Sequence, residues 1–350
     1  MLDFDPNAAP DADSGVFGLP HEEKDSALVL LPVPWEATTS YGAGTSDGPA
    51  AILEASGQVD LFDGEVHKPY EPGIFMRPES KEVRGWNKTA KAAAQKIIKV
   101  GGRIEGNKAL QKTLKTVNDL GGKLNDWVYR ETSSLMKSGK IVGIVGGDHS
   151  VPYGAFKAAG EKFGEFGILH FDAHSDTRVA YEGFTWSHAS IMYNAMENIP
   201  QITRLVQVGI RDFCEQEYEF TRALGARAKV FYDRDLSRRR FNGETWATTA
   251  SEIVAALPPQ VWISFDIDGL DPKLCPHTGT PVPGGLELAQ AVYLIGMVAR
   301  SGRKIIGFDL NEVSPDPDGK DEWDANVGMR LLYKLVAWTF VSRGLRKAHE

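Results

Sequence analysis

Cysteine is nearly absent from this chain of 350 residues, which contains only Cys214 and Cys275. Two cysteines so far apart in sequence cannot build the disulfide framework of a small secreted protein. The chain also has no CxxC pattern, which would have suggested a thiolate metal site or a redox centre. We therefore expect two free thiols in a reducing compartment.

Long apolar runs and a surplus of basic residues are also missing. The longest apolar run, around residues 27–35, is far too short to span a bilayer, and the acidic N-terminus lacks the basic and apolar regions of a signal peptide. The net charge of -8, with no evident Lys/Arg face, argues against nucleic acid or an anionic membrane as a partner. The sequence thus predicts a cytoplasmic protein, and its charge suits a cationic substrate.

The remaining composition is that of a globular protein, with 42% hydrophobic and 25% charged residues, which is enough for a large core. Eight short, nearly continuous apolar runs alternate with segments of helical spacing, as in parallel strands buried on both faces. We predict an α/β fold, a three-layer α/β/α sandwich with a parallel sheet of about eight strands. The expected strands are residues 27–33, 73–76, 141–145, 167–171, 204–208, 229–232, 261–265 and 304–308, and the expected helices are residues 152–163, 188–197, 214–224, 245–256, 286–299 and 327–341.

No internal repeat or long linker divides the chain. We therefore expect a single catalytic domain over residues 26–350, preceded by a loose N-terminal arm over residues 1–25. Residues 88–140 have the composition of an extended helical excursion, and we expect glycine pairs at 101–102 and 121–122 to break it. The arm and the excursion are candidates for covering the site or for contacts between subunits.

Acidic and histidine side chains are concentrated where predicted strands end, in the segments GGDHS, FDAHSD, SFDIDGLDP and FDLNEVSP. In an extended chain, side chains two residues apart point to the same face, so the acidic and histidine side chains within one segment gather on one side. Open α/β sheets place their ligands beyond the carboxyl ends of the strands, where these segments would converge. Carboxylates packed this closely repel one another unless cations separate them. We predict a binuclear metal site with six ligands, His149, Asp172, His174, Asp176, Asp266 and Asp268.

Charge counting agrees with a binuclear site, because two divalent ions balance four aspartates and a bridging hydroxide leaves the site slightly anionic. A water held between two ions about 3.5–4 Å apart becomes hydroxide near neutral pH, which supplies a nucleophile for hydrolysis. Carboxylate and imidazole ligands without thiolate favour Mn(II), Ni(II) or Fe(II). Any one of these aspartates alone would more often be a helix cap or turn residue, and we assign such structural roles to Asp148 and Asp271.

Further residues are candidates for catalysis and substrate binding. His188 follows the FDAHSD segment in a polar loop and could protonate a leaving amine, although it could also cap or pack. Glu312 ends the last strand at the same sheet edge and could hold a cationic substrate, although it could also be a surface charge. Trp186 and Thr280, the latter in a loop rich in glycine and proline, are candidate substrate contacts, with core packing as the commoner role of tryptophan.

The segments GGDHS, DAHSD and SFDIDGLDP resemble, in order and spacing, the three signatures of the ureohydrolase family, which includes arginase and agmatinase. The resemblance extends from about residue 29 to the C-terminal helix. It implies a parallel eight-stranded α/β/α sandwich, two divalent ions per subunit (Mn(II), or Ni(II) in one branch), and homo- or hetero-oligomers, either trimers or hexamers. It also assigns the six residues above as metal ligands, His188 as a mobile acid/base histidine, and Glu312 as the residue that binds the guanidinium group.

The resemblance further implies hydrolysis of a guanidino or formimino C–N bond. The stretch TRVAYEGFTWSH lacks the asparagine that arginases usually carry there, which argues against arginine as the substrate. The segments LCPHTGTPVPGG and DEWDANVG are most similar to the agmatinase branch that includes guanidine hydrolase and metformin (biguanide) hydrolase. We therefore expect a small guanidine, biguanide or agmatine-like substrate, cleaved to urea or guanylurea plus an amine or ammonia. Two alternatives are a non-catalytic subunit that supports an active paralogue and a metal-dependent deacetylase.

Overall fold

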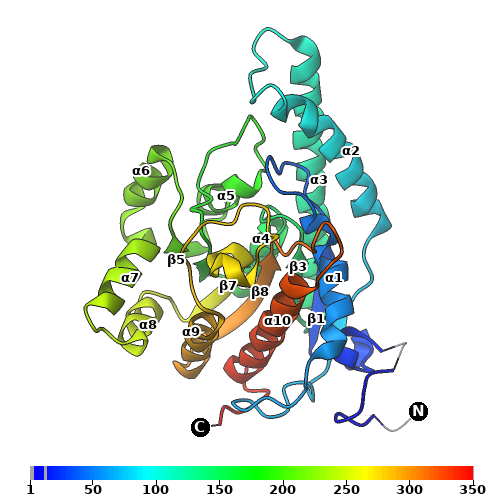
Figure 1. The fold of residues 1–350 in the computed structure, drawn as a ribbon, viewed down its shortest axis with the longest axis vertical. Coiled ribbons are helices and arrows are strands. Elements are labelled where there is room, and N and C mark those ends of the chain that lie inside the picture. The colour runs from blue at the N-terminus through cyan, green and yellow to red at the C-terminus, as the bar shows by residue number, and fades with distance from the viewer. Residues whose placement is uncertain (1–3, 12–13, 350) are drawn as a thin grey trace.

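The computed structural model describes residues 4–11 and 14–349 and contains one parallel sheet of eight strands in the order β2-β1-β3-β8-β7-β4-β5-β6 (Figure 1). All strand pairs are parallel. The predicted fold class and each of the eight predicted strands are therefore confirmed. The strands are β1 (Leu28–Val33), β2 (Ile74–Met76), β3 (Ile141–Gly146), β4 (Phe166–Phe171), β5 (Ile202–Ile210), β6 (Ala228–Tyr232), β7 (Gln260–Asp266) and β8 (Lys304–Asn311).

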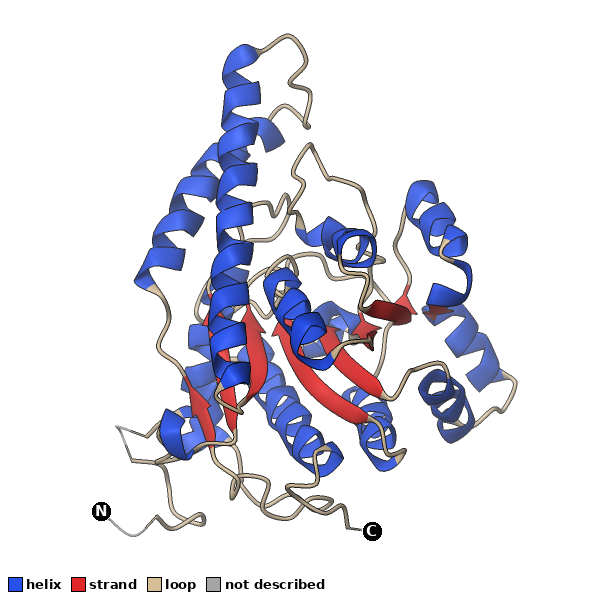
Figure 2. Cartoon of the chain, turned by 180° about the vertical axis from the view of Figure 1, so that it is seen from behind, coloured by secondary structure: helices blue, strands red, loops and turns tan. Residues whose placement is uncertain are grey.

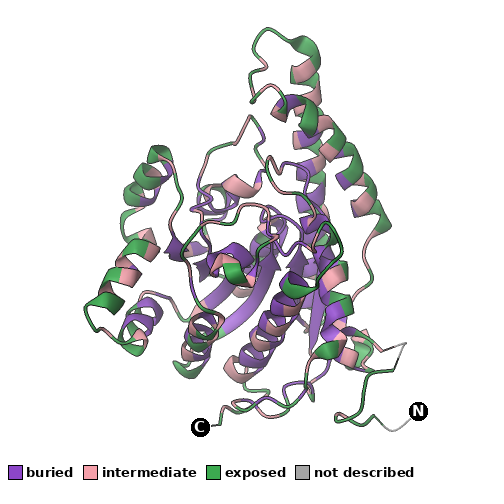
Figure 3. Ribbon diagram, viewed as in Figure 1, coloured by how far each residue is buried: buried purple, intermediate pink, exposed green. Residues whose placement is uncertain are grey.

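Helices cover both faces of the sheet, which explains why β1, β3 and β4 are buried over their whole length and almost entirely apolar (Figure 2, Figure 3). One core lies beneath α1 (Gly48–Ala55), α8 (Trp246–Ala255), α9 (Leu288–Arg300) and α10 (Trp323–Ser342). The other lies beneath α2 (Lys81–Ile98), α3 (Lys108–Lys137), α4 (Tyr153–Phe163) and α5 (Ile191–Asn198). Two further helices, α6 (Glu215–Ala223) and α7 (Asp233–Phe241), lie beside the edge strand β6, and α7 also contacts β5.

Helices α2 and α3 form a long antiparallel pair whose tip projects beyond the sheet (Figure 1). The glycine pair at 101–102 does end a helix, and both residues adopt positive φ in the turn. The expected break at 121–122 is wrong, because α3 continues through it. A Cβ atom on Gly121 would lie 3.0 Å from Trp186, so this glycine permits close packing and does not interrupt the helix.

The N-terminal segment is partly packed against the domain. Val16, Phe17 and Leu19 are buried in the core, and the ring of Phe17 meets that of Tyr333 edge to face at 4.9 Å. Residues 1–3 and 12–13 of the expected arm lie outside the described residues. Both cysteines are free, as expected, and no helix in the part of the chain that the structure describes is long and apolar enough to cross a membrane.

The strand order explains where the functional residues meet. Strands β3 and β4 follow one another in sequence but are separated in the sheet by β8 and β7. At such a switch point the loops after neighbouring strands diverge and leave a crevice at the carboxyl edge. The four motifs follow β3, β4, β7 and β8, so all of them reach this crevice.

Candidate metal centre and active site

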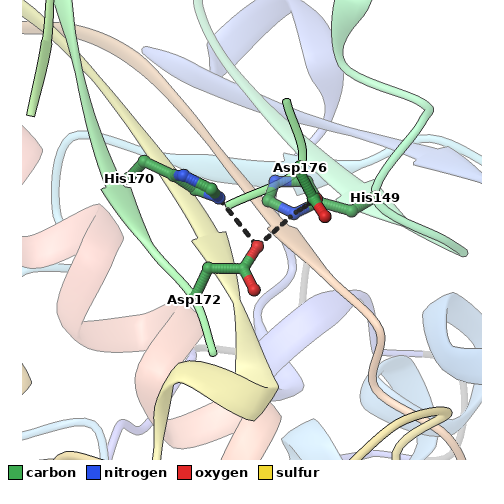
Figure 4. Close-up of side chains that lie close together, drawn as sticks. All are labelled: His149, His170, Asp172 and Asp176. Atoms are coloured by element: carbon green, nitrogen blue, oxygen red, sulfur yellow. Dashed lines mark hydrogen bonds and ion pairs between the residues drawn. The ribbon is translucent and has the colours of Figure 1, made fainter. Parts of the chain in front are cut away.

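His149 lies at the centre of the first group of potential metal ligands (Figure 4). Its Nδ1 atom is 3.0 Å from Oδ2 of Asp172, 3.3 Å from Oδ2 of Asp176 and 3.4 Å from Oδ2 of Asp266. All four side chains are buried. One imidazole nitrogen and three carboxylate oxygens therefore face a common point.

His174 forms a second group with Asp172 and Asp268. Its Nδ1 atom is 3.0 Å from Oδ2 of Asp268 and 3.5 Å from Oδ1 of Asp172. Asp172 thus offers one oxygen to each group, which is the arrangement needed to place two ions side by side. The structure brings together all six residues that the sequence predicts as ligands.

The carboxylates of this centre oppose one another electrostatically. Burial, followed by the charges of Asp268 and Asp172, raises the pKa of Asp266 well above its usual range. Burial and the charge of Asp172 raise the pKa of Asp176 to about 7. Such crowding is costly without a compensating cation. Oxygen and imidazole donors without thiolate fit hard or intermediate divalent ions, so the residues present fit two such ions.

A further buried histidine, His170, belongs to this centre although the sequence analysis treated it as part of a strand. It precedes Asp172 by two residues, so it lies on the same face of the chain. Its Nε2 atom is 2.7 Å from Oδ2 of Asp172 (Figure 4). Its Nδ1 atom is 3.0 Å from Nε2 of Gln207. Because the Gln207 amide nitrogen can only donate, the His170 Nε2–H is left to donate to Asp172 and hold that carboxylate in place. The two-residue spacing was the signal that could have revealed it.

Two residues of the site have strained backbones. Asp176 has φ 55° and Glu312 has φ 62°, a left-handed conformation that residues other than glycine seldom adopt. Such residues persist only where the surrounding structure fixes them, and they cluster at functional sites. For Glu312, the backbone N–H donates to the Gly147 carbonyl and the carbonyl accepts from the Thr278 hydroxyl, which together hold the strained position.

A cavity of about 200 Å³ opens over the metal-ligand groups. His188 begins a short 3₁₀ turn before α5 and lines this cavity, and burial lowers its pKa to about 4. Thr280 also lines it. Glu312 is not among the residues that line this cavity, and its Oε1 accepts a hydrogen bond of 2.9 Å from the His149 backbone N–H.

Trp186 and two residues of the segments that resemble the agmatinase branch, His277 and Trp323, do not line the cavity. Trp186 is not among the residues that line the cavity, since its ring packs against Tyr153 at 4.9 Å and against Gly121 of α3. Its position is that of a packing residue. The Nδ1 atom of His277 is 2.8 Å from Oδ2 of Asp324, and the indole N–H of Trp323 donates to the Lys273 carbonyl at 2.9 Å. Both contacts attach the loop that follows β7 to α10.

The family model of the arginase family matches residues 26–337, which is most of the chain. The chain belongs to the arginase family. Family membership makes it a hydrolase of amidine C–N bonds. The family uses a binuclear divalent metal centre, typically of manganese, and the two groups of His and Asp side chains described above fit such a centre. The six residues that the resemblance implied as ligands lie together in this structure.

Individual arginase-family relatives are similar over nearly their whole length. The chain is 33% identical to N(1)-aminopropylagmatine ureohydrolase of Thermus thermophilus, over 92% of this chain and 93% of the relative. It is 30% identical to agmatinase of Proteus mirabilis, over 89% of each chain. Among solved structures, proclavaminate amidino hydrolase from Streptomyces clavuligerus has the same fold, with a TM-score of 0.71 and 22% identity over 96% of this chain and 99% of that one.

Loading the centre with metal should release protons. Burial alone would lower the pKa of His174, but Asp268 and Asp172 raise it to about 12, and the pKa values of Asp176 and Asp266 are also raised. Metal ligands must be deprotonated, so protons compete with the ions and the affinity should rise with pH through neutrality. Titration calorimetry of Mn(II) at pH 7 in buffers of different ionisation enthalpy should report on the order of one to two protons released per chain. A heat independent of the buffer would contradict this, and His174→Asn should release fewer protons.

Proposed function

We propose that this chain hydrolyses the guanidino C–N bond of a small cationic compound, with guanidine, a metformin-like biguanide and an agmatine-like amine as candidate substrates. The products would be urea or guanylurea together with an amine or ammonia. The observation that carries the proposal is the convergence of six metal-ligand side chains with His188 and Glu312 at one sheet edge. When bound, two divalent ions would supply a water activated for attack on the guanidino carbon.

Glu312 is suited to hold the guanidinium group. It is buried, and burial and the charges of Asp148 and Asp268 raise its pKa well above its usual range. A carboxylate in such surroundings gains more from a neighbouring cation than an exposed one does. The hydrogen bond from the His149 N–H fixes one of its oxygens, and its backbone is held by Gly147 and Thr278. The group is thus preorganised beside the metal ligands.

His188 is suited to transfer a proton to the leaving nitrogen. Because burial depresses its pKa to about 4, it is neutral at pH 7, and a neutral imidazole can take up a proton and pass it on. We expect His188→Asn to lower kcat by about 10²- to 10⁴-fold, the usual contribution of a general acid or base, with little change in metal content. His21→Asn is the control, because His21 lies in the N-terminal segment, where its Nδ1 accepts from the Ile74 backbone N–H at the start of β2, and it does not line the cavity. Equal losses in the two variants would argue against a catalytic role.

The residues that line the cavity favour a substrate whose end away from the guanidino group is cationic over one in which that end is anionic. Asp212 is at the rim, with its side chain 69% exposed and its carboxylate 4.0 Å from Nε2 of His174, so it can receive an ammonium group. Arg178, which also lines the cavity, is near Glu217, with 3.6 Å between Nε and Oε2, and stacks over Tyr181. Its charge is thereby balanced. This arrangement, together with the ureohydrolase of Thermus thermophilus named above, supports an agmatine-like substrate as one of the three candidates.

A substrate panel would test the assignment. The enzyme is reconstituted with Mn(II) and separately with Ni(II), and the release of urea, amine or ammonia is measured from guanidine, agmatine, metformin, arginine, guanidinobutyrate and formiminoglutamate. We expect a cationic guanidine without a carboxylate to have the highest kcat/KM. If arginine or guanidinobutyrate were the best substrate, the proposed substrate class would be wrong.

A second candidate is a subunit with little activity of its own that supports a paralogous ureohydrolase in a mixed trimer or hexamer. The intact ligand set disfavours this role, because a scaffold has no physical need for clustered buried aspartates. Metal analysis after reconstitution distinguishes the two candidates, since an inactive scaffold would bind fewer than about one ion per chain while an enzyme of this kind would bind two.

A further inference from the structure

Behind His149, on the side away from the carboxylates, lies a buried network that joins β7 to β8. The Nε2 atom of His149 is 2.8 Å from the Ser264 hydroxyl, and that hydroxyl is 2.8 Å from Oδ1 of Asp309. Asp309 also accepts hydrogen bonds from the indole N–H of Trp262 at 2.6 Å and from the amide of Asn311 at 2.5 Å. All five residues are fully buried.

The register of the two strands creates this network. Ser264 is directly opposite Asp309, and Trp262 is opposite Gly307. A Cβ atom on Gly307 would lie 2.3 Å from the Trp262 ring, so glycine is needed there to admit the indole. Because alternate residues share a face, Ser264 and Asp266 point to the same side of β7, which places the network directly beside a metal ligand.

The chemistry of the donors gives the network one direction. The Trp262 indole can only donate, and it donates to Oδ2 of Asp309; the Asn311 amide nitrogen donates to Oδ1. Both carboxylate oxygens are therefore acceptors. The single Ser264 hydrogen must then point at Asp309, so the Ser264 oxygen can only accept from His149. It follows that Nε2 of His149 carries the hydrogen.

We propose that Ser264 and Asp309 are positioning residues that fix His149 as the Nε2–H tautomer and thereby reserve its Nδ1 lone pair for the metal held with Asp172, Asp176 and Asp266. In a neutral imidazole one ring nitrogen donates and the other accepts, so fixing the hydrogen on Nε2 leaves Nδ1 as the ligand atom. The hydrogen bond also fixes the plane of the ring.

The two groups of ligands differ in this respect. The outer nitrogen of His174 faces only the exposed Asp212, at 4.0 Å, which is beyond hydrogen-bonding distance. The Ser264–Asp309 network therefore acts on the His149 group alone. This inference rests on the metal centre of the proposed function and is independent of the substrate, so its failure can be told apart from the failure of the substrate assignment.

The experiment measures metal binding without turnover. Mn(II) alone is titrated into metal-free protein, and free Mn(II) is counted by electron paramagnetic resonance. His149→Asn and His174→Asn first assign the two binding steps to the two groups. We expect Ser264→Ala to weaken the His149 step by about 10- to 100-fold, the usual effect of losing a partner of a metal-bound histidine, while the His174 step stays unchanged. Ser264→Thr, which retains the hydroxyl, should largely restore the affinity of the His149 step.

Asp309→Asn provides a second, nearly isosteric variant. Its amide nitrogen must take the place of one accepting oxygen. A donating N–H would then face either the Trp262 indole N–H or the Ser264 hydroxyl hydrogen, so the hydrogen bonds would no longer all run in one direction. We expect selective weakening of the same step in this variant. Equal weakening of both steps, or no weakening in either Ser264→Ala or Asp309→Asn, would overturn the proposal. Thermal unfolding of the metal-free variants shows whether the fold is retained, and a variant that fails to fold is replaced by the other in the same comparison.

Discussion

Replacing Asp266 with alanine should remove metal binding and turnover together. Asp266 ends β7, and its Oδ1 accepts a hydrogen bond of 2.8 Å from the Asp268 backbone N–H while its Oδ2 is 3.4 Å from Nδ1 of His149. The alanine variant therefore loses a ligand and also the hydrogen bond that positions Asp268. Because activation of water by the ions supplies several kcal/mol of the rate enhancement, we expect kcat/KM to fall by at least about 1000-fold.

A matched control is available within the same motif. Asp271 lies five residues further along the chain, and its side chain accepts from the Lys273 backbone N–H in a turn. Asp271→Ala should retain both ions and most of the activity. Metal content by mass spectrometry and urea release are measured on the same preparations. Full activity of Asp266→Ala, or loss of metal in both variants, would contradict the assigned ligand role.

Replacing Glu312 with glutamine should abolish most activity while the metal centre stays intact. Glutamine has nearly the same shape and keeps an oxygen for the His149 N–H, so the turn before the metal ligand is preserved. The variant loses the negative charge that would pair with the guanidinium group. Breaking a buried ion pair by removing one partner costs about 3–5 kcal/mol, so we expect kcat/KM to fall by at least about 100-fold.

The measurement for this variant separates substrate binding from metal binding. Steady-state kinetics and ion content are determined for Glu312→Gln and for Asp318→Asn, an exposed carboxylate in the loop that follows β8. Only the former should lose activity, and both should hold two ions. If Glu312→Gln lost its metal, the residue would support the metal centre instead of the substrate. Unchanged kinetics would show that the guanidinium group is held elsewhere.

The eight strands and the grouping of the proposed metal ligands could be predicted from sequence because both depend on short-range patterns. Strand residues buried on both faces are continuously apolar, and the side chains of Asp172, His174 and Asp176 share a face because of the two-residue period of an extended chain. The general rule that ligands gather at carboxyl ends of parallel strands then placed these segments together. Among the α-helices of the described residues, α1 and α7 lay outside the predicted segments, and α2 begins before the predicted helical excursion.

The supporting residues could not be predicted because their roles depend on how distant segments pair. Ser264 meets Asp309 only through the β7–β8 register, which nothing within either strand specifies. Trp186 was a reasonable candidate for the substrate pocket, yet its position depends on Gly121, a residue of α3 that is distant in sequence. The sequence pattern of that glycine pair indicated a helix break, whereas the packing of Trp186 explains its presence inside a continuous helix.

The left-handed backbones of Asp176 and Glu312 have a consequence for how such an enzyme could be made more heat-resistant. Each of these conformations costs on the order of 1 kcal/mol, which a glycine would relieve. Directed evolution that selects for thermal tolerance alone should therefore accept glycine at these positions and discard a proposed metal ligand or the carboxylate proposed to bind the guanidinium group. Stability and activity are thus in direct conflict at two residues, and a screen for durable variants must retain turnover as a criterion.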